Sequence, residues 1–212
     1  MDIIIRPELQ SDHFENENVT REAFWNLFVP GCNEHVLVHK LREHPDYLQD
    51  LSFVAIYQNK IIGNILYAKS WVINEDNKKL DTLSFGPVSV LPEYQRKGVG
   101  SALIQHTIRI AKNLNYAGII IYGHPSNYCK HGFKSSKDYN ISNSEGKFPY
   151  SLLVLELQKD VFANHTWKYV ESDVYNISEA EAEEYDKKFP QKVMEYKPTQ
   201  EEFFIACRAF LD

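Results

Sequence analysis

The segment from residue 80 to residue 122 constrains the fold of this chain more than any other part of the sequence. An extended run that ends near Val90 leads through a glycine-containing loop into residues 98–115, where apolar side chains recur at helical spacing. A continuous apolar run with three isoleucines follows at residues 117–122, and such a run is typical of a strand buried on both faces. Strand, helix and buried strand in this order predict a βαβ unit in a parallel or mixed sheet.

Further extended and helical runs surround this unit. The sequence predicts additional strands at residues 3–5, 52–57, 61–73 and 151–157, and helices at residues 20–28 and 34–43. Beyond about residue 159 the pattern changes, because two capping boxes, which begin at Ser178 and Thr199, predict two more helices. We therefore expect one domain at residues 1–158 and a C-terminal extension at residues 159–212 that packs on it.

The composition argues against several classes of protein. The formal net charge is −6 and the pI is about 5.8, so the chain lacks the basic surface that nucleic-acid binding requires. Three widely spaced cysteines, Cys32, Cys129 and Cys207, indicate neither a disulfide framework nor a zinc module. No apolar run approaches the ~20 residues of a membrane span, and the short, charged N-terminus differs from a signal peptide. We expect a cytoplasmic protein that binds neither nucleic acid nor a membrane.

The loop before the long helix has the features of a diphosphate site. It reads Gln95-Arg96-Lys97-Gly98-Val99-Gly100-Ser101, and its two glycines let the backbone approach a ligand closely. At a helix start the free N–H groups and the positive end of the dipole converge, which favours phosphate groups. Arg96 and Lys97 add positive charge, and Ser101 adds a hydroxyl donor. Gly-x-Gly at a helix start is also common without any ligand, and this loop matches neither a P-loop nor a dinucleotide-binding motif.

Together with a second motif, the loop resembles a known family. Gln-x-x-Gly-x-Gly between a strand and a long helix resembles the pyrophosphate-binding signature of the GNAT (Gcn5-related) N-acetyltransferase superfamily. Tyr128-Cys129-Lys130-His131-Gly132-Phe133 resembles the tyrosine and Gly-Phe that close the GNAT core. Gly123-His124-Pro125 and residues 30–35 are similar to the YhbS-like bacterial branch. The resemblance covers residues 1–158 and implies an α/β (α+β) GNAT fold, with a mixed central sheet of six to seven strands flanked by helices and a C-terminal helical extension.

The resemblance also implies a function and roles for residues. The protein would transfer the acetyl group of acetyl-CoA, a co-substrate, to a primary amine by direct attack in a ternary complex. The backbone of Val88, Ser89 and Val90 would bind the pantetheine arm like an added strand, and residues Gln95, Arg96, Lys97, Gly98, Val99, Gly100 and Ser101 would bind the pyrophosphate. Tyr128 would protonate the departing thiolate, and a packed aromatic ring is the alternative reading.

The sequence leaves the identity of the partners and of the proton acceptor open. The acceptor is a small-molecule amine or a protein amino group, and a homodimer is a further hypothesis. No metal is expected, since His35 and His39 have no third ligand. Many family members carry a glutamate on the strand before the loop, where this chain has Ser84. The base that accepts the amine proton would then be Glu34, His35, His124 or a water relay. Because the strand carboxylate is missing, a non-catalytic acyl-CoA-binding sensor is the alternative function.

Overall fold

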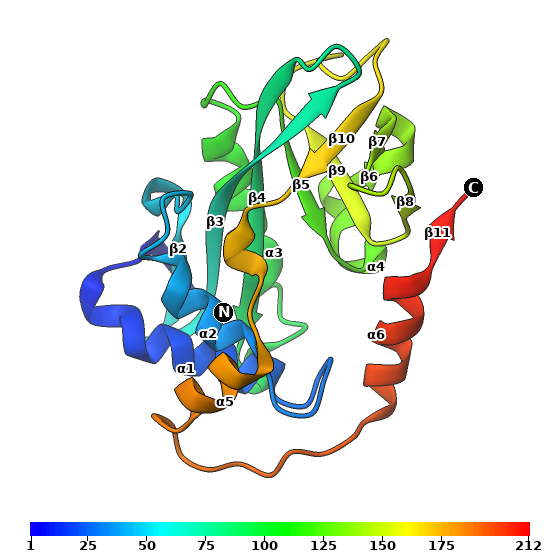
Figure 1. The fold of residues 1–212 in the computed structure, drawn as a ribbon. Helices are drawn as coiled ribbons and strands as arrows, with labels where there is room; N and C mark the ends of the chain where they lie inside the picture. Colours follow the sequence, from blue (N-terminus) through cyan, green and yellow to red (C-terminus); the bar gives the residue numbers. More distant parts are fainter.

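The computed structural model describes residues 1–212 and contains eleven strands and six α-helices (Figure 1). The strands are β1 (Ile4–Pro7), β2 (Phe53–Tyr57), β3 (Lys60–Asn74), β4 (Lys79–Val90), β5 (Gly118–Tyr122), β6 (Lys134–Ser135), β7 (Ile141–Ser142), β8 (Phe148–Pro149), β9 (Leu152–Glu156), β10 (Trp167–Val170) and β11 (Phe210–Leu211). The helices are α1 (His13–Phe24), α2 (Glu34–Leu41), α3 (Val99–Ala111), α4 (Pro125–Tyr128), α5 (Glu179–Asp186) and α6 (Pro198–Arg208).

Nine of the strands form one mixed sheet. Its order is β1-β2-β3-β4-β5-β9-β6, with β10 paired to both β3 and β7, while β8 and β11 form a separate pair. The pairs β4–β5 and β10–β7 are parallel, and the others are antiparallel. The predicted mixed sheet flanked by helices is confirmed, but the predicted number of six to seven strands is too low. The difference comes from β6, β7 and β10, because strands of two to four residues are too short to show a periodic pattern.

Helices cover both faces of this sheet. Tyr67 of β3 faces α3, where its hydroxyl lies 2.9 Å from Thr107 Oγ1. Asn64 is three residues earlier and therefore faces the other way, where it donates to Thr20 Oγ1 of α1 at 2.9 Å. The apolar side of α2 is buried against Leu66, on the same face as α1. Thus α3 covers one face of the central strands, and α1 and α2 cover the opposite face (Figure 1).

Two helix starts differ from the sequence-based expectation. The first helix begins at His13 and not at Thr20. The Thr20 hydroxyl is buried inside α1 and donates to the Asn16 carbonyl at 3.1 Å, so it does not cap a helix. The capping box at Ser178 is confirmed, but α6 begins at Pro198 and the Thr199 hydroxyl donates to the Leu27 carbonyl at 2.9 Å. In both misplaced starts, a threonine hydroxyl hydrogen-bonds to a backbone carbonyl instead of the N–H groups of a new helix.

Residues beyond position 158 contribute to the sheet and to the surface around α1. Strand β10 pairs with residues 71–74 of β3. Helix α5 is joined to α1 by Arg21 and Asp186, whose Nε and Oδ1 atoms are 2.5 Å apart. A long connection then leads to α6 and β11, which reaches β8 near the C-terminus (Figure 1). None of the helices combines the length and hydrophobicity that crossing a bilayer requires.

Candidate active site

The parallel strands β4 and β5 separate after a short contact, and this opening is the candidate active site. Their register contains one pair of residues, Leu83 and Ile119, whereas β4 pairs with β3 along its length. The β3–β4 register shifts around Gly86, where β4 carries an extra residue as in a β-bulge. The β4 backbone beyond Leu83 therefore has no strand partner on its β5 side. An unpaired edge of this kind can accept an extended ligand as an additional strand.

Helix α3 begins at this opening with a free N-terminus. Gly98 is the N-cap residue, and its φ of 88° is a left-handed value that favours glycine. The Ala102 N–H donates to the Gly98 carbonyl at 2.9 Å, which closes the first turn. The N–H groups of Val99, Gly100 and Ser101 precede this bond and lack an acceptor within the helix. They give an anion three converging donors at the positive end of the helix dipole.

The space and charge around these donors fit a diphosphate. A Cβ atom on Gly98 would have no heavy atom within 4 Å, and one on Gly100 would meet Val90 at 3.6 Å. The side chains of Arg96 and Lys97 are exposed at the rim of the loop. The loop is therefore open and positively charged, as a site for two phosphate groups requires.

The β4 residues next to the loop point alternately toward the opening and into the core. Val88 and Val90 lie under Gly100, on the α3 side. Ser89 points the other way and its hydroxyl donates to Thr20 Oγ1 at 3.0 Å, so only its backbone is available to a ligand. The Gln95 side chain donates to the Val90 carbonyl at 3.0 Å, so this predicted pantetheine acceptor already has one donor.

Tyr128 lies on the β5 side of the opening, at the end of α4. A Cβ atom on Gly123 would be 2.3 Å from Tyr128 Cε2, so the tyrosine ring requires glycine beneath it. The ring of Tyr128 also packs with Phe85 of β4 and Phe133, at centroid distances of 5.8 and 5.9 Å. Burial raises the pKa of Tyr128 to about 12, so the phenol keeps its proton at neutral pH. The Tyr-x-x-x-Gly-Phe motif thus builds an aromatic cluster that bridges the separating strands.

The predicted bases have different surroundings. His124 caps α4, with its Nδ1 atom 2.8 Å from Ser126 Oγ. Glu34 accepts the Asn33 N–H at 3.1 Å at the start of α2, and burial raises its pKa to about 7. His35 is completely buried, and burial lowers its pKa to about 4. His35 Nε2 lies 3.2 Å from Asp186 Oδ1 of α5, and none of the contacts of these three side chains joins them to Tyr128.

Sequence reasoning missed a segment that lines the face opposite α3. The Tyr169 hydroxyl crosses the sheet from β10 and donates to the Ile120 carbonyl of β5 at 3.3 Å. The Cε1 atom of Tyr175 lies 3.6 Å from the position that a Cβ on Gly86 would take. Glu171, between the two tyrosines in sequence, is partly exposed, and burial raises its pKa to about 7. No local motif marks these residues, and their only signal is the aromatic composition of residues 167–175.

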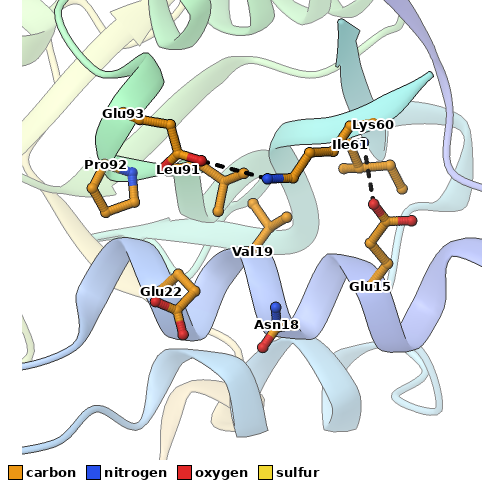
Figure 2. A pocket seen from close by; sticks show the side chains of 9 residues that line it. All are labelled: Glu15, Asn18, Val19, Glu22, Lys60, Ile61, Leu91, Pro92 and Glu93. Carbon is orange, nitrogen blue, oxygen red and sulfur yellow. Dashed lines mark hydrogen bonds and ion pairs between the residues drawn. The ribbon is translucent and has the colours of Figure 1, made fainter. Parts of the chain in front are cut away.

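Two surface cavities lie outside the opening. One, of about 300 Å³, lies between α1 and the residues before the phosphate loop (Figure 2). The cavity is lined by Glu15, Glu22 and Glu93, and its one lysine, Lys60, is paired with Glu93 at 3.4 Å. The negative charge of this cavity therefore disfavours phosphate groups. The other, of about 400 Å³, lies beside Trp71. Neither cavity includes residues 95–101 or the tyrosine at position 128.

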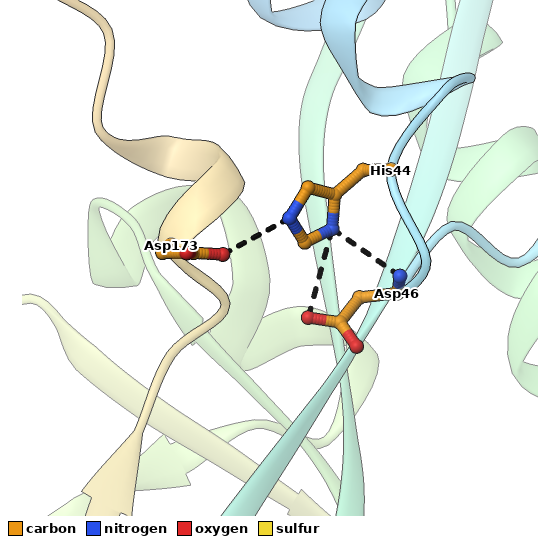
Figure 3. A group of neighbouring side chains, drawn as sticks. All are labelled: His44, Asp46 and Asp173. Carbon is orange, nitrogen blue, oxygen red and sulfur yellow. Dashed lines mark hydrogen bonds and ion pairs between the residues drawn. The ribbon is translucent and has the colours of Figure 1, made fainter.

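Two clusters of histidine and carboxylate side chains have polar atoms within 4.8 Å of one another. In the first, His44 Nε2 lies 3.0 Å from Asp173, and its Nδ1 atom lies 3.7 Å from Asp46 (Figure 3). The second cluster consists of Glu75, Asp76 and His165. The histidines in both clusters already contact the carboxylates, and we assign no metal to them. The first cluster fastens the segment that carries Glu171 to the loop after α2.

An open strand edge beside a helix start with free N–H groups defines a class of proteins that bind an extended, diphosphate-bearing ligand between two diverging strands. The model of the Acetyltransferase (GNAT) family matches residues 21–133, which is more than half of the chain. The chain therefore belongs to the GNAT family of acetyltransferases, and the family membership predicted from the two motifs is confirmed.

A curated relative supports this membership. The chain is 33% identical over 98 residues to the "Uncharacterized N-acetyltransferase YjhQ" of Escherichia coli (strain K12). This match covers 46% of the present chain and 54% of the relative, so it spans about half of the relative's length.

Solved structures share the fold. The GNAT family N-acetyltransferase YhbS from Escherichia coli, in complex with CoA, has a TM-score of 0.71 at 21% identity, over 82% of this chain and 92% of that one. A GNAT family acetyltransferase from Brucella melitensis, in complex with acetyl-CoA, has a TM-score of 0.64 at 23% identity, over 82% of this chain and 99% of that one. At these identities the likeness shows the GNAT fold.

Proposed function

We propose that this chain transfers the acetyl group of acetyl-CoA to a primary amine that attacks directly while both substrates are bound. The observation that carries the proposal is the opening between β4 and β5, with free N–H groups of α3 next to β4 and Tyr128 next to β5. The CoA and acetyl-CoA complexes of the two similar structures support the same ligand here. The acceptor would be a small-molecule amine or a protein amino group, and the protein would act in the cytoplasm.

The opening offers matching groups for each part of the co-substrate. The N–H groups of Val99, Gly100 and Ser101 would hold the diphosphate, with Arg96 and Lys97 adding charge at the rim. The unpaired β4 edge at residues 88–90 would bind the pantetheine arm through its backbone. Acetyl-CoA supplies an acetyl group activated as a thioester, and no metal is needed for that chemistry.

Tyr128 would act as the acid for the leaving group. A thiolate leaves the acetyl group more readily when a proton reaches its sulfur, and a positioned phenol can donate one. Burial raises the pKa of Tyr128 to about 12, so the side chain is protonated throughout the neutral range. The aromatic cluster with Phe85 and Phe133 would hold the phenol in a fixed position beside the thioester.

Calorimetric titration with acetyl-CoA tests the co-substrate site. The wild type should bind with a Kd in the micromolar range, about −8 kcal/mol. Gly100→Trp should abolish binding, because the indole would occupy the space above Val88 and Val90. Gly100→Ala is the matched control, since its Cβ would meet Val90 at an ordinary distance of 3.6 Å and should weaken binding only slightly. A folded wild type that binds no acetyl-CoA would contradict the proposal, and binding without acetyl transfer to any amine would favour the acyl-CoA sensor.

A further inference from the structure

We propose that Glu171 binds the primary ammonium group of the acceptor and accepts its proton, in the role that a carboxylate at position 84 of β4 would otherwise have. This inference rests on the proposed acetyl transfer and extends it to the acceptor side of the opening. It is carried by the path of Tyr169 across the sheet, by the placement of Tyr175 over β4, and by the exposure of Glu171 between them.

The path of β10 directs Glu171 toward the opening. Strand β10 ends with Val170, which pairs with Trp71 of β3. Tyr169 points across the sheet face to the Ile120 carbonyl of β5, at 3.3 Å. Glu171 directly follows β10, and its charge acts on Tyr122, Tyr169 and Tyr175, so it lies beside these rings on this face. This is the face opposite α3, from which an acceptor would approach the opening.

Tyr175 marks where this segment crosses β4. Its ring lies over Gly86, beside the β-bulge at which β4 leaves β5. Its hydroxyl is buried against Ser84 of β4. Burial raises the pKa of Tyr175, a hydrogen bond with Ser84 lowers it, and the charge of Glu171 raises it, which places Ser84 and Glu171 around this phenol.

Glu171 combines access with a proton affinity suited to this task. Its side chain is partly exposed, and burial is the one influence that shifts its pKa, to about 7, so no neighbouring cation or donor already stabilises its charge. A base with a pKa near the working pH is both available and strong enough to accept a proton. The other titratable groups facing it are Tyr122, Tyr169 and Tyr175, and burial raises the pKa of each, with a further increase from the Glu171 charge. Phenols that titrate so high stay neutral and do not compete for this proton.

The same surroundings favour a cation. Tyr122 at the end of β5 is 44% exposed, and its ring lies 6.0 Å from that of Tyr169. Aromatic faces attract ammonium groups, and a carboxylate beside them adds direct charge attraction. An alkylammonium with an attached ring or hydrocarbon chain matches this combination.

Side-chain contacts hold the segment in place. Ser172 Oγ donates to Asp46 Oδ2 at 2.7 Å, and His44 lies 3.0 Å from Asp173 (Figure 3). Val174 is buried against α2 and Leu66. We call residues 171–175 the acceptor segment. Its contacts fix Glu171 at the opening without using the carboxylate itself.

The proposed step combines a proton transfer to Glu171 with an acetyl transfer to nitrogen. Glu171 takes one proton from the ammonium group, which leaves a neutral amine with a free electron pair. The nitrogen forms a bond to the acetyl carbonyl carbon, and the bond between that carbon and sulfur breaks. Tyr128 donates its phenol proton to the thiolate sulfur, and the second proton, which leaves the nitrogen as the amide forms, restores the Tyr128 phenol by way of solvent. The products are the N-acetyl amide and CoA, and the proton on Glu171 passes to solvent.

Glu34 is the other carboxylate whose pKa burial raises to about 7. It already accepts the Asn33 N–H at 3.1 Å, and its contacts lie at the start of its own helix. The two glutamates therefore form a matched pair: burial raises the pKa of both, but only Glu171 lies beside Tyr122, Tyr169 and Tyr175.

The test compares Glu171→Gln and Glu34→Gln with the wild type, using 2-phenylethylamine as the probe amine. In the wild type, kcat should rise with pH through about 7, because Glu171 must be deprotonated to accept the proton. Glu171→Gln should lower kcat about 100-fold and remove this pH dependence, while the acetyl-CoA Kd stays within about twofold. Glu34→Gln should keep the pH dependence. Calorimetric titration of 2-phenylethylamine into the CoA-saturated protein should show binding that Glu171→Gln weakens about tenfold.

The outcomes separate this inference from the proposed function. A Glu171→Gln protein that keeps the pH dependence, or a Glu34→Gln protein that loses it, would overturn the assignment of Glu171. A wild type that binds acetyl-CoA but neither binds nor acetylates 2-phenylethylamine would overturn the ammonium site while leaving the acetyl-CoA site intact. Failure of the wild type to bind acetyl-CoA would instead contradict the proposed function itself.

Discussion

The two faces of the sheet at the β4–β5 opening, the α3 side and the opposite side, are built from different kinds of structure. On the α3 side, the ligand-facing groups are backbone N–H groups at a helix start and a tyrosine set in an aromatic cluster. On the opposite side, Glu171 and Tyr175 belong to the acceptor segment, which is fastened to the loop after α2 by Ser172 and Asp173. The difference suggests that co-substrate binding and acceptor chemistry can be changed separately in this protein.

Removing the hydroxyl of Tyr128 should lower kcat more than removing charge at the loop rim or loosening the acceptor segment, and it should leave the α3 side folded. Tyr128→Phe is expected to lower kcat about 100-fold, because the thiolate loses its proton donor. The acetyl-CoA Kd should not change, since the ring still packs with Phe85 and Phe133. Steady-state kinetics and calorimetry check both values, with Tyr196→Phe, at an exposed tyrosine, as the control. A normal kcat in Tyr128→Phe would mean that the ring serves packing alone.

Removing the positive charge at the loop rim should have a smaller effect, confined to binding. Replacing Arg96 by Gly and Lys97 by Ala is expected to weaken acetyl-CoA binding about tenfold, since charge-assisted contacts contribute on the order of 1.5 kcal/mol each and these are exposed. Glycine suits the Arg96 position because its φ is 57°. The loss should shrink at high salt, which screens exposed charges. Calorimetry at two salt concentrations measures it, with Lys159→Ala as the control. An unchanged Kd would show that the backbone N–H groups bind the diphosphate unaided.

Loosening the acceptor segment should have the smallest effect, confined to the other side. His44→Asn removes the contact with Asp173 and should lower kcat for 2-phenylethylamine about two- to fivefold, because exposed ion pairs contribute about 0.2–1 kcal/mol. The acetyl-CoA Kd should stay the same. His165→Asn is the matched control, since His165 lies 3.0 Å from Glu75 in a similar pair away from the opening. A weaker acetyl-CoA Kd in His44→Asn would break the separation between the two sides.

The same contrast explains what the sequence could predict. The α3 side is built from neighbouring residues, so its glycines, its helix period and the later Tyr-x-x-x-Gly-Phe motif were visible as a local pattern. The acceptor segment depends on pairing between Val170 and Trp71 and on a hydrogen bond between Ser172 and Asp46, which are 126 residues apart. Such long-range contacts leave no local period, and a single glutamate that follows a four-residue strand carries no signal of its own.

The central claim is that an amine bound at the acceptor segment attacks acetyl-CoA held at α3 within one ternary complex. The most direct test measures initial rates of the wild type while the concentrations of acetyl-CoA and 2-phenylethylamine are both varied. We predict intersecting lines in double-reciprocal plots, because both substrates must be bound before transfer occurs. Parallel lines would contradict this account, since they indicate that the acetyl group is first transferred to the protein and CoA leaves before the amine binds.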